Sequence, residues 1–183
     1  TVFCPVLFFF GRKRKGWFQQ EVFFKKPSLT ETGTVVGYSV VFIYFCQFAG
    51  VLLIQMLLAL LGKTLPSEEV NYPTAFPQIV MLCIVVALLP ALFEELCVRG
   101  AVLSVLKRYG VGFACVISAL VFMMLHNTLV QLPLAFGAGL SFAFCIFKFR
   151  SIWPAMVSHF VVNLNSCILC LILSIPSENL RGF

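Results

Sequence analysis

A handful of polar side chains interrupts the long apolar stretches of this 183-residue chain. A carboxylate can take a proton from water, an imidazole can accept or donate one, and a carboxamide can donate hydrogen bonds to an oxyanion. The ionisable side chains in or directly beside the apolar stretches are Glu94, Glu95, Arg99, His126 and His159, and the carboxamide of Asn163 joins them. Their chemical types could carry out hydrolysis or proton transfer.

The spacing of the acidic motif separates its two glutamates. Glu95 and Arg99 are four residues apart, so on a helix they share a face and can neutralise each other. Glu94 lies about 100° around the same helix, and its own neighbour four residues later is apolar. Glu94 therefore needs a partner from another segment. The candidates are His126 and His159, since the chain has two histidines in all.

The two histidines also occur in helical spacings. His159 and Asn163 are four residues apart and share a helical face, as do Phe122 and His126. In one interpretation, Glu94 is a general base that takes a proton from water with the help of His126. His159 and Asn163 would then donate hydrogen bonds to the developing oxyanion.

In a second interpretation, the same side chains bind a metal ion. Catalytic Zn²⁺ takes three protein ligands and leaves a fourth position for water. Glu94, His126 and His159 would be these ligands, and the metal would activate the water. Glu95 and Arg99 would orient the site in either case. The spacing leaves both interpretations open.

The composition indicates the solvent that surrounds these residues. The chain is 61% hydrophobic and 11% charged, and its mean hydropathy is +1.02. Soluble domains average about 25% charged residues, so the polar surface here is too small to coat a globule in water. We therefore expect a lipid bilayer as the solvent. The net charge of +6 comes without an aromatic-basic motif, and we expect no nucleic-acid partner.

Apolar stretches of membrane-spanning length recur along the chain. A transmembrane helix needs roughly 20 apolar residues. We predict an all-α, polytopic transmembrane helical bundle with six crossings, the first of them truncated. Three parts are expected: a helix end with a basic linker (1–34), a helical core (35–176) and a tail (177–183). The predicted crossings are residues 1–10, 35–61, 70–93, 111–125, 129–147 and 152–175.

The basic residues predict the orientation of these segments. Basic residues precede the stretch 35–61, separate 70–93 from 111–125, and separate 129–147 from 152–175. These loops alternate along the chain, so all of them can lie on one side of the membrane. Lys and Arg accumulate on the cytoplasmic side, and we therefore expect the basic loops in the cytoplasm.

Three short motifs occur in order on successive apolar segments. Glu94–Arg99 matches EExxxR, Phe122–His126 matches FxxxH, and His159–Asn163 matches HxxxN. In this order and topology they resemble the CAAX protease and bacteriocin-processing family of intramembrane proteases, to which the type II CAAX prenyl endopeptidases belong. The resemblance extends over residues 76–175.

The resemblance implies a helical membrane core with its site inside the bilayer. It implies that Glu94 and His126 activate water and that His159 and Asn163 form the oxyanion site. Glu95, Arg99 and Phe122 would be the supporting residues. Members of the family are described both as metalloproteases and as metal-free glutamate enzymes, so Zn²⁺ is one possible cofactor.

We predict an intramembrane endopeptidase that cleaves a membrane-associated peptide or protein substrate. The expected location is a prokaryotic cell membrane, as a multi-pass integral protein. Buried Glu and His side chains also relay protons in transporters. A proton-coupled transporter, or an immunity or partner-binding scaffold without activity, is therefore the alternative from a different functional class.

Overall fold

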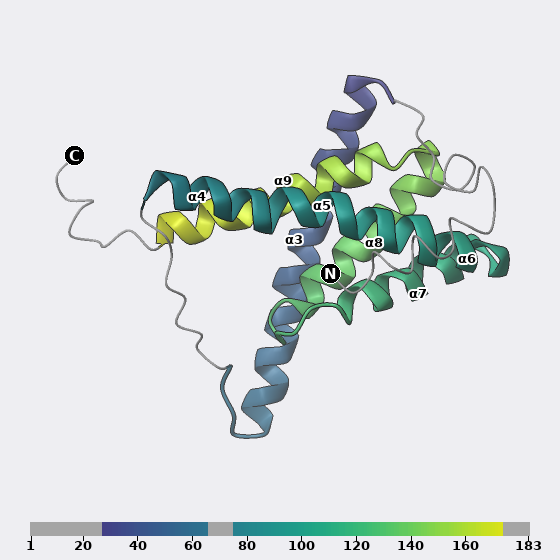
Figure 1. Ribbon diagram of the computed structural model, residues 1–183. Helices are drawn as coiled ribbons and strands as arrows, with labels where there is room; N and C mark the ends of the chain where they lie inside the picture. The colour runs from purple at the N-terminus through teal and green to yellow at the C-terminus, as the bar shows by residue number, and fades with distance from the viewer. Residues whose placement is uncertain (1–26, 66–74, 174–183) are drawn as a thin grey trace.

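The computed structural model describes residues 27–65 and 75–173, and all its helices lie within these ranges (Figure 1). The predicted crossing at residues 1–10 and the tail 177–183 lie outside the described residues. The all-α class is confirmed. The elements are α3 (Leu29–Leu60), α4 (Phe76–Cys83), η1 (Ile84–Leu88), α5 (Leu89–Glu94), η2 (Glu95–Leu103), α6 (Ser104–Leu106), η3 (Lys107–Tyr109), α7 (Val111–Met123), α8 (Leu132–Phe149) and α9 (Trp153–Leu173).

The first long helix, α3, begins earlier than the predicted residue 35. Ser28 caps it: the Ser28 hydroxyl accepts from the Glu31 backbone N–H at 3.1 Å, and the Glu31 carboxylate accepts from the Ser28 backbone N–H at 2.9 Å. This reciprocal pair is a capping box, which satisfies N–H groups that the first turn leaves without partners. The polar first turn thus belongs to the helix, although hydropathy alone assigns it to the linker.

A single run of helix extends from α4 through η3, and the acidic motif lies in its middle. The predicted segment 70–93 stops at Glu94, but the helix continues to Tyr109. It ends where Gly110 adopts a φ of +107°, a conformation that favours glycine. Two stretches, η1 and η2, are π-helices with wider turns. π-Helical turns are rare and occur frequently at functional sites.

Within residues 27–65 and 75–173, three helices are long and apolar enough to cross a membrane: Leu29–Leu60, Phe76–Tyr109 and Leu132–Phe149. The helix α7 is apolar but has 13 residues, which is roughly 20 Å of helix against a hydrocarbon thickness of about 30 Å. The predicted segment 111–125 therefore forms a shorter helix than a full crossing requires. The count of six crossings and the cytoplasmic side of the basic loops stay predictions.

The helix α8 lies at the centre of the packing. It contacts α7 and α3 on two sides and α9 at another, while α9 runs alongside η1 and α5 (Figure 1). Two glycines of α8 permit these contacts. A Cβ on Gly139 would lie 2.6 Å from the Ala119 Cα of α7, and one on Gly137 would lie 2.7 Å from the Cys46 Cβ of α3. Small residues let helix backbones approach closely in this way.

We expect Gly139→Ala to lower the free energy of unfolding by about 1–3 kcal/mol, because the new methyl group overpacks the α7–α8 contact. The matched control is Gly37→Ala on α3, where a Cβ meets nothing within 4 Å. Its effect should be neutral or stabilising through helix propensity. Thermal unfolding of the purified proteins in detergent measures both, and equal effects would contradict the packing argument.

Candidate active site

Glu94 and Glu95 both face the imidazole of His159, one at each ring nitrogen. The Glu95 Oε1 lies 3.1 Å from Nδ1, and the Glu94 Oε2 lies 3.9 Å from Nε2. Glu94 ends α5 and Glu95 begins the π-helix η2, while His159 comes from α9. A carboxylate oxygen only accepts hydrogen bonds, so the Nδ1–H of the ring donates to Glu95. This leaves Nε2 to face Glu94.

The two glutamates occupy different environments although they are neighbours in sequence. The Glu94 side chain is 35% exposed, whereas that of Glu95 is fully buried. A buried carboxylate needs compensating partners. Glu95 has two, since its Oε1 also lies 3.3 Å from the Arg99 Nη1 in the predicted ion pair. Glu95 is therefore fixed within the protein, and Glu94 is the carboxylate that water or a substrate can reach.

Arg99 connects the acidic motif to α8 and is itself buried. Its Nη2 donates to the Gly139 carbonyl at 3.3 Å, and its guanidinium lies 4.5 Å from the Phe122 ring centroid and 5.5 Å from that of Phe142. A planar, delocalised cation is well suited to stacking on aromatic rings. The buried Glu95 Oε2 and Arg99 Nε have no hydrogen-bond partner within the described residues, so a bound water or substrate atom would have polar groups to meet.

Two phenylalanines enclose the His159 ring. Phe142 is stacked on it with centroids 5.2 Å apart, and Phe122 meets it edge-on at 5.6 Å. Both phenylalanine side chains are fully buried. They exclude water from two sides of the imidazole, which strengthens the electrostatic interactions around it.

His126 lies just beyond the end of α7 and contacts the cluster through Phe122. Its Nδ1 is 3.1 Å from the Phe122 carbonyl oxygen, and its ring is 5.2 Å from the Phe122 ring. Within the described residues, the imidazole paired with Glu94 is that of His159 and not that of His126. Phe122 thus contacts both histidine rings and Arg99.

Asn163 lies one helical turn after His159 and binds an irregular part of the long helix. Its Nδ2 donates to the Val86 carbonyl at 3.1 Å. In an α-helix this carbonyl would accept from residue 90, which is Pro90 and has no N–H. Asn163 therefore satisfies a carbonyl next to the proline. The carboxamide has a second N–H, which this contact leaves available.

One known family covers the part of the chain that holds this cluster. Residues 76–165 match the family model described as type II CAAX prenyl endopeptidase Rce1-like. Residues 76–165 therefore form an Rce1-like domain. The match begins at the first residue of α4 and includes all six polar residues of the cluster. No curated protein and no solved structure gave a match.

The residues of this Rce1-like domain do not form a ready metal site. Within the described ranges, no three His, Cys, Asp or Glu side chains lie in a group that could hold a metal ion. The His159 Nδ1 is engaged by Glu95, and the His126 ring is turned to the Phe122 carbonyl. The zinc ligand set of Glu94, His126 and His159 is therefore not assembled in this arrangement.

Several residues of the Rce1-like site carried no signal in the sequence. Phe142 is one of 21 phenylalanines, and its place against His159 comes from the packing of α8 on α9. The acceptors at Val86 and Gly139 are backbone carbonyls, and a motif of side-chain types does not indicate which backbone carbonyl is used. Gly139 has no side chain, so its residue type does not indicate that its carbonyl accepts a hydrogen bond from Arg99.

We expect Arg99→Ala to destabilise the protein by about 3–5 kcal/mol, because it leaves the buried Glu95 carboxylate without its cation. The control is Arg108→Ala, which removes an exposed guanidinium stacked on Tyr109 and should cost less than about 1 kcal/mol. Thermal unfolding in detergent compares the two variants. If Arg99→Ala lowered the stability no more than Arg108→Ala does, the buried Glu95–Arg99 ion pair would not be what holds the cluster together.

Proposed function

We propose that this protein is an intramembrane endopeptidase that hydrolyses a peptide bond with water activated by Glu94. The observation that carries the proposal is the His159 ring held between a reachable carboxylate, Glu94, and a buried one, Glu95. The Rce1-like domain supports protease activity. The catalytic roles of the individual residues are our own assignment.

The reaction needs a base for the attacking water and a hydrogen-bond donor for the carbonyl oxygen of the scissile peptide bond. Glu94 takes a proton from water, and the water oxygen attacks the peptide carbonyl carbon. The attacking oxygen and the carbonyl oxygen are then bonded to one carbon, so their partners must lie a few ångströms apart. The distance of 3.9 Å from the Glu94 Oε2 to the His159 Nε2 meets this requirement. Nε2–H donates to the oxyanion, with the ring carrying a proton on each nitrogen.

Collapse of the tetrahedral intermediate completes the cycle. The carbon–nitrogen bond breaks, and Glu94 returns its proton to the leaving amine. The products are a carboxylate and an amine, and Glu94 is ionised again. No group other than water is consumed.

The buried residues act by holding His159 in place. Glu95 accepts from Nδ1–H and so turns Nε2 toward Glu94, while Arg99 fixes Glu95. Phe142 stacks on the ring and limits its rotation. Preorganised donors lower the barrier because they do not reorganise during the reaction.

His126 and Asn163 have supporting places in the proposal. His126 contacts Phe122, and its proposed role is to assist Glu94 with the attacking water. Asn163 donates one N–H to the Val86 carbonyl and directs the other to the oxyanion beside His159. The substrate class is a membrane-associated peptide or protein, since the helix that carries Glu94 and Glu95 is long and apolar enough to cross a membrane. A CAAX tail is the substrate that the family's description suggests.

We expect Glu94→Gln to lower kcat about 10²–10⁴-fold, because the amide cannot take the proton from water. His159→Ala should lower kcat about 10²–10³-fold through loss of the oxyanion donor. The assay uses purified, folded protein and a peptide with a lipidated tail, with product masses determined. The control is Glu31→Gln on α3, since glutamine also serves in a capping box.

A second matched pair tests Asn163. Asn163→Ala should lower kcat. Asn165→Ala, on the same helix as Asn163, removes a hydrogen bond to the Tyr44 hydroxyl of α3 and should not lower kcat. Full activity in the Glu94→Gln variant would reject the proposed base. Full activity in the Asn163→Ala variant would contradict only the proposed role of Asn163 as a hydrogen-bond donor to the oxyanion.

Metal dependence is tested separately. We expect a metal-free protein to retain activity, because the three candidate ligands do not converge within the described residues. Elemental analysis of the purified protein and an assay after dialysis against a chelator measure this. Loss of activity that returns with one equivalent of Zn²⁺ would instead support the zinc mechanism.

A further inference from the structure

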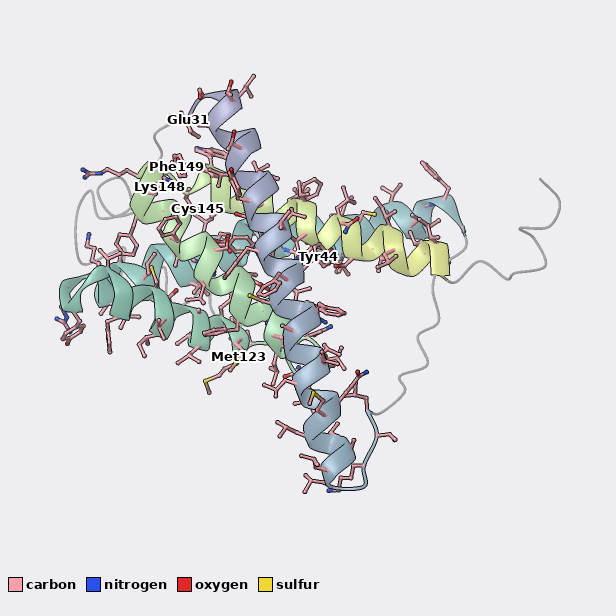
Figure 2. The ribbon with its side chains drawn as sticks, turned by 180° about the vertical axis from the view of Figure 1, so that it is seen from behind. Glu31, Tyr44, Met123, Cys145, Lys148 and Phe149 are labelled. Atoms are coloured by element: carbon pink, nitrogen blue, oxygen red, sulfur yellow. The ribbon has the colours of Figure 1, made fainter. Side chains whose placement is uncertain are left out.

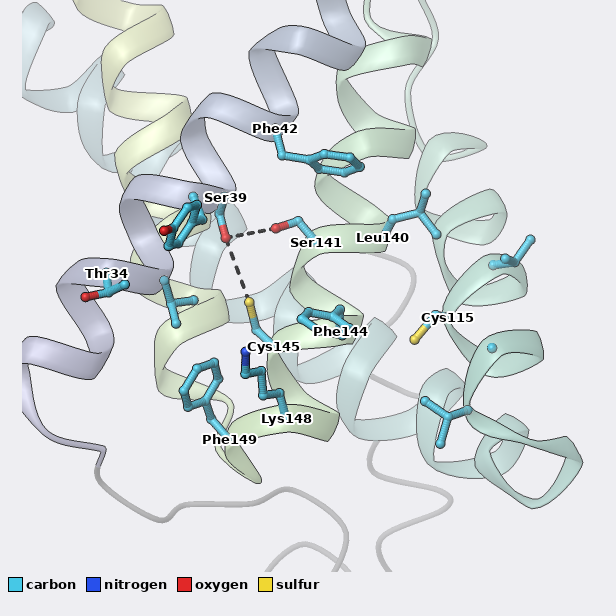
Figure 3. A pocket seen from close by; sticks show the side chains of 15 residues that line it. Thr34, Ser39, Phe42, Cys115, Leu140, Ser141, Phe144, Cys145, Lys148 and Phe149 are labelled. Atoms are coloured by element: carbon cyan, nitrogen blue, oxygen red, sulfur yellow. Dashed lines mark hydrogen bonds between the residues drawn. The ribbon is translucent and has the colours of Figure 1, made fainter.

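A groove lies on the side of α8 that faces away from His159. Its volume is about 650 Å³, and α3, α7 and α8 form its walls. None of its lining residues belongs to the polar cluster of the candidate active site. Figure 3 shows side chains of Phe42, Leu140 and Phe144 along it and Cys115 on the α7 wall.

The groove offers an occupant an apolar surface. Its polar side chains satisfy one another: the Ser141 hydroxyl donates to the Ser39 hydroxyl at 2.8 Å, and Ser39 contacts the Cys145 sulfur at 3.8 Å (Figure 3). The remaining walls are mostly aliphatic or aromatic. An occupant therefore needs no hydrogen bonds along the groove, as a hydrocarbon chain does not.

One end of the groove is basic. Thr34 of α3, Val111 of α7 and Phe149 of α8 line this end, and Lys148, which lies beside Phe149 in Figure 2, is also a lining residue. The Lys148 Nζ is 5.7 Å from the ring centroids of both Phe144 and Phe149. Within the described part of the chain, no carboxylate forms an ion pair with Lys148. The acidic residue at this end, Glu31, is engaged in the α3 capping box.

Among the residues that the structure describes, more cations than anions lie close to this end. Lys107 and Arg108 directly precede the α7 residues that line the groove, and Arg150 follows those of α8. Basic pockets between transmembrane helices at the membrane surface bind anionic headgroups. The apolar length and the basic end are thus arranged like the two parts of a lipid.

We propose that this groove is a binding site for one anionic phospholipid. An acyl chain lies between α3 and α7 over Ser141 and Cys145, and the headgroup phosphate lies at Lys148. The lining residues of α8 extend from Leu140 to Phe149, roughly 13 Å along the helix axis, which leads from the membrane surface into the hydrocarbon. The bound lipid joins α3 to α7, two helices that otherwise meet through α8.

Native mass spectrometry of the purified full chain tests the site with phosphatidylglycerol and phosphatidylcholine. We expect one tightly bound lipid and a preference for phosphatidylglycerol. Lys148→Gln should reduce that preference about fivefold, since a cation near the surface contributes about 1 kcal/mol toward an anionic lipid. The control is Lys63→Gln, beyond the opposite end of α3.

A second variant fills the groove. Gly112 lines it, and a Cβ there meets nothing within 4 Å, so Gly112→Leu should fold and displace the acyl chain. Bound lipid of both headgroups should then fall at least several-fold. Gly37→Leu, which is equally open but outside the groove, should bind as the unaltered protein does. Val116→Phe, at an exposed lining position, replaces Gly112→Leu if that variant does not fold.

The results have clear alternatives. Equal binding of the two lipids by the unaltered protein, or unchanged binding in both groove variants, would overturn the proposal. Absence of a retained lipid would likewise overturn it. The readout is lipid binding, so it is independent of whether the protein cleaves peptides.

Discussion

The buried Glu95 carboxylate is the interaction on which the site depends. One of its oxygens meets both the Arg99 guanidinium and the His159 imidazole, so helix η2 and helix α9 are joined at a single atom. Burying this charge without partners would cost several kcal/mol. Arg99 in turn reaches the Gly139 carbonyl, which brings α8 into the same network. Three helices are thereby held in the register that presents Glu94 and the His159 Nε2 to one another.

The packing around this network is made from small and aromatic residues in combination. Gly139 lets α7 approach α8 closely, and this approach brings Phe122 over Arg99. Phe122 and Phe142 then exclude water from the His159 ring on two sides. In a membrane, helices associate through such close packing and through polar contacts, because lipid is as apolar as the side chains. The site and the bundle are therefore stabilised by the same contacts.

Irregular backbone accompanies the site at two places. The π-helix η2 begins at Glu95, and the π-helix η1 precedes Pro90, whose missing N–H leaves the Val86 carbonyl for Asn163. Backbone groups away from water need partners, and a neighbouring helix supplies one here. The groove between α3, α7 and α8 is lined by regular α-helices and is mostly apolar. One helix thus separates a polar, irregular face from a face suited to lipid.

The sequence by itself determined the helical class, most segment centres and the residues of the cluster. Long apolar runs can be satisfied in a bilayer only by helices or closed barrels, and four-residue spacing places Glu95 with Arg99 on one face. The partner of Glu94 was decided by tertiary structure. Both histidines have the same chemistry, and only the packing of α9 on α5 and η1 brings His159 to Glu94, while His126 contacts Phe122. The backbone partners Val86 and Gly139 were hidden for the same reason, since every residue has a carbonyl and only the fold selects which one is used.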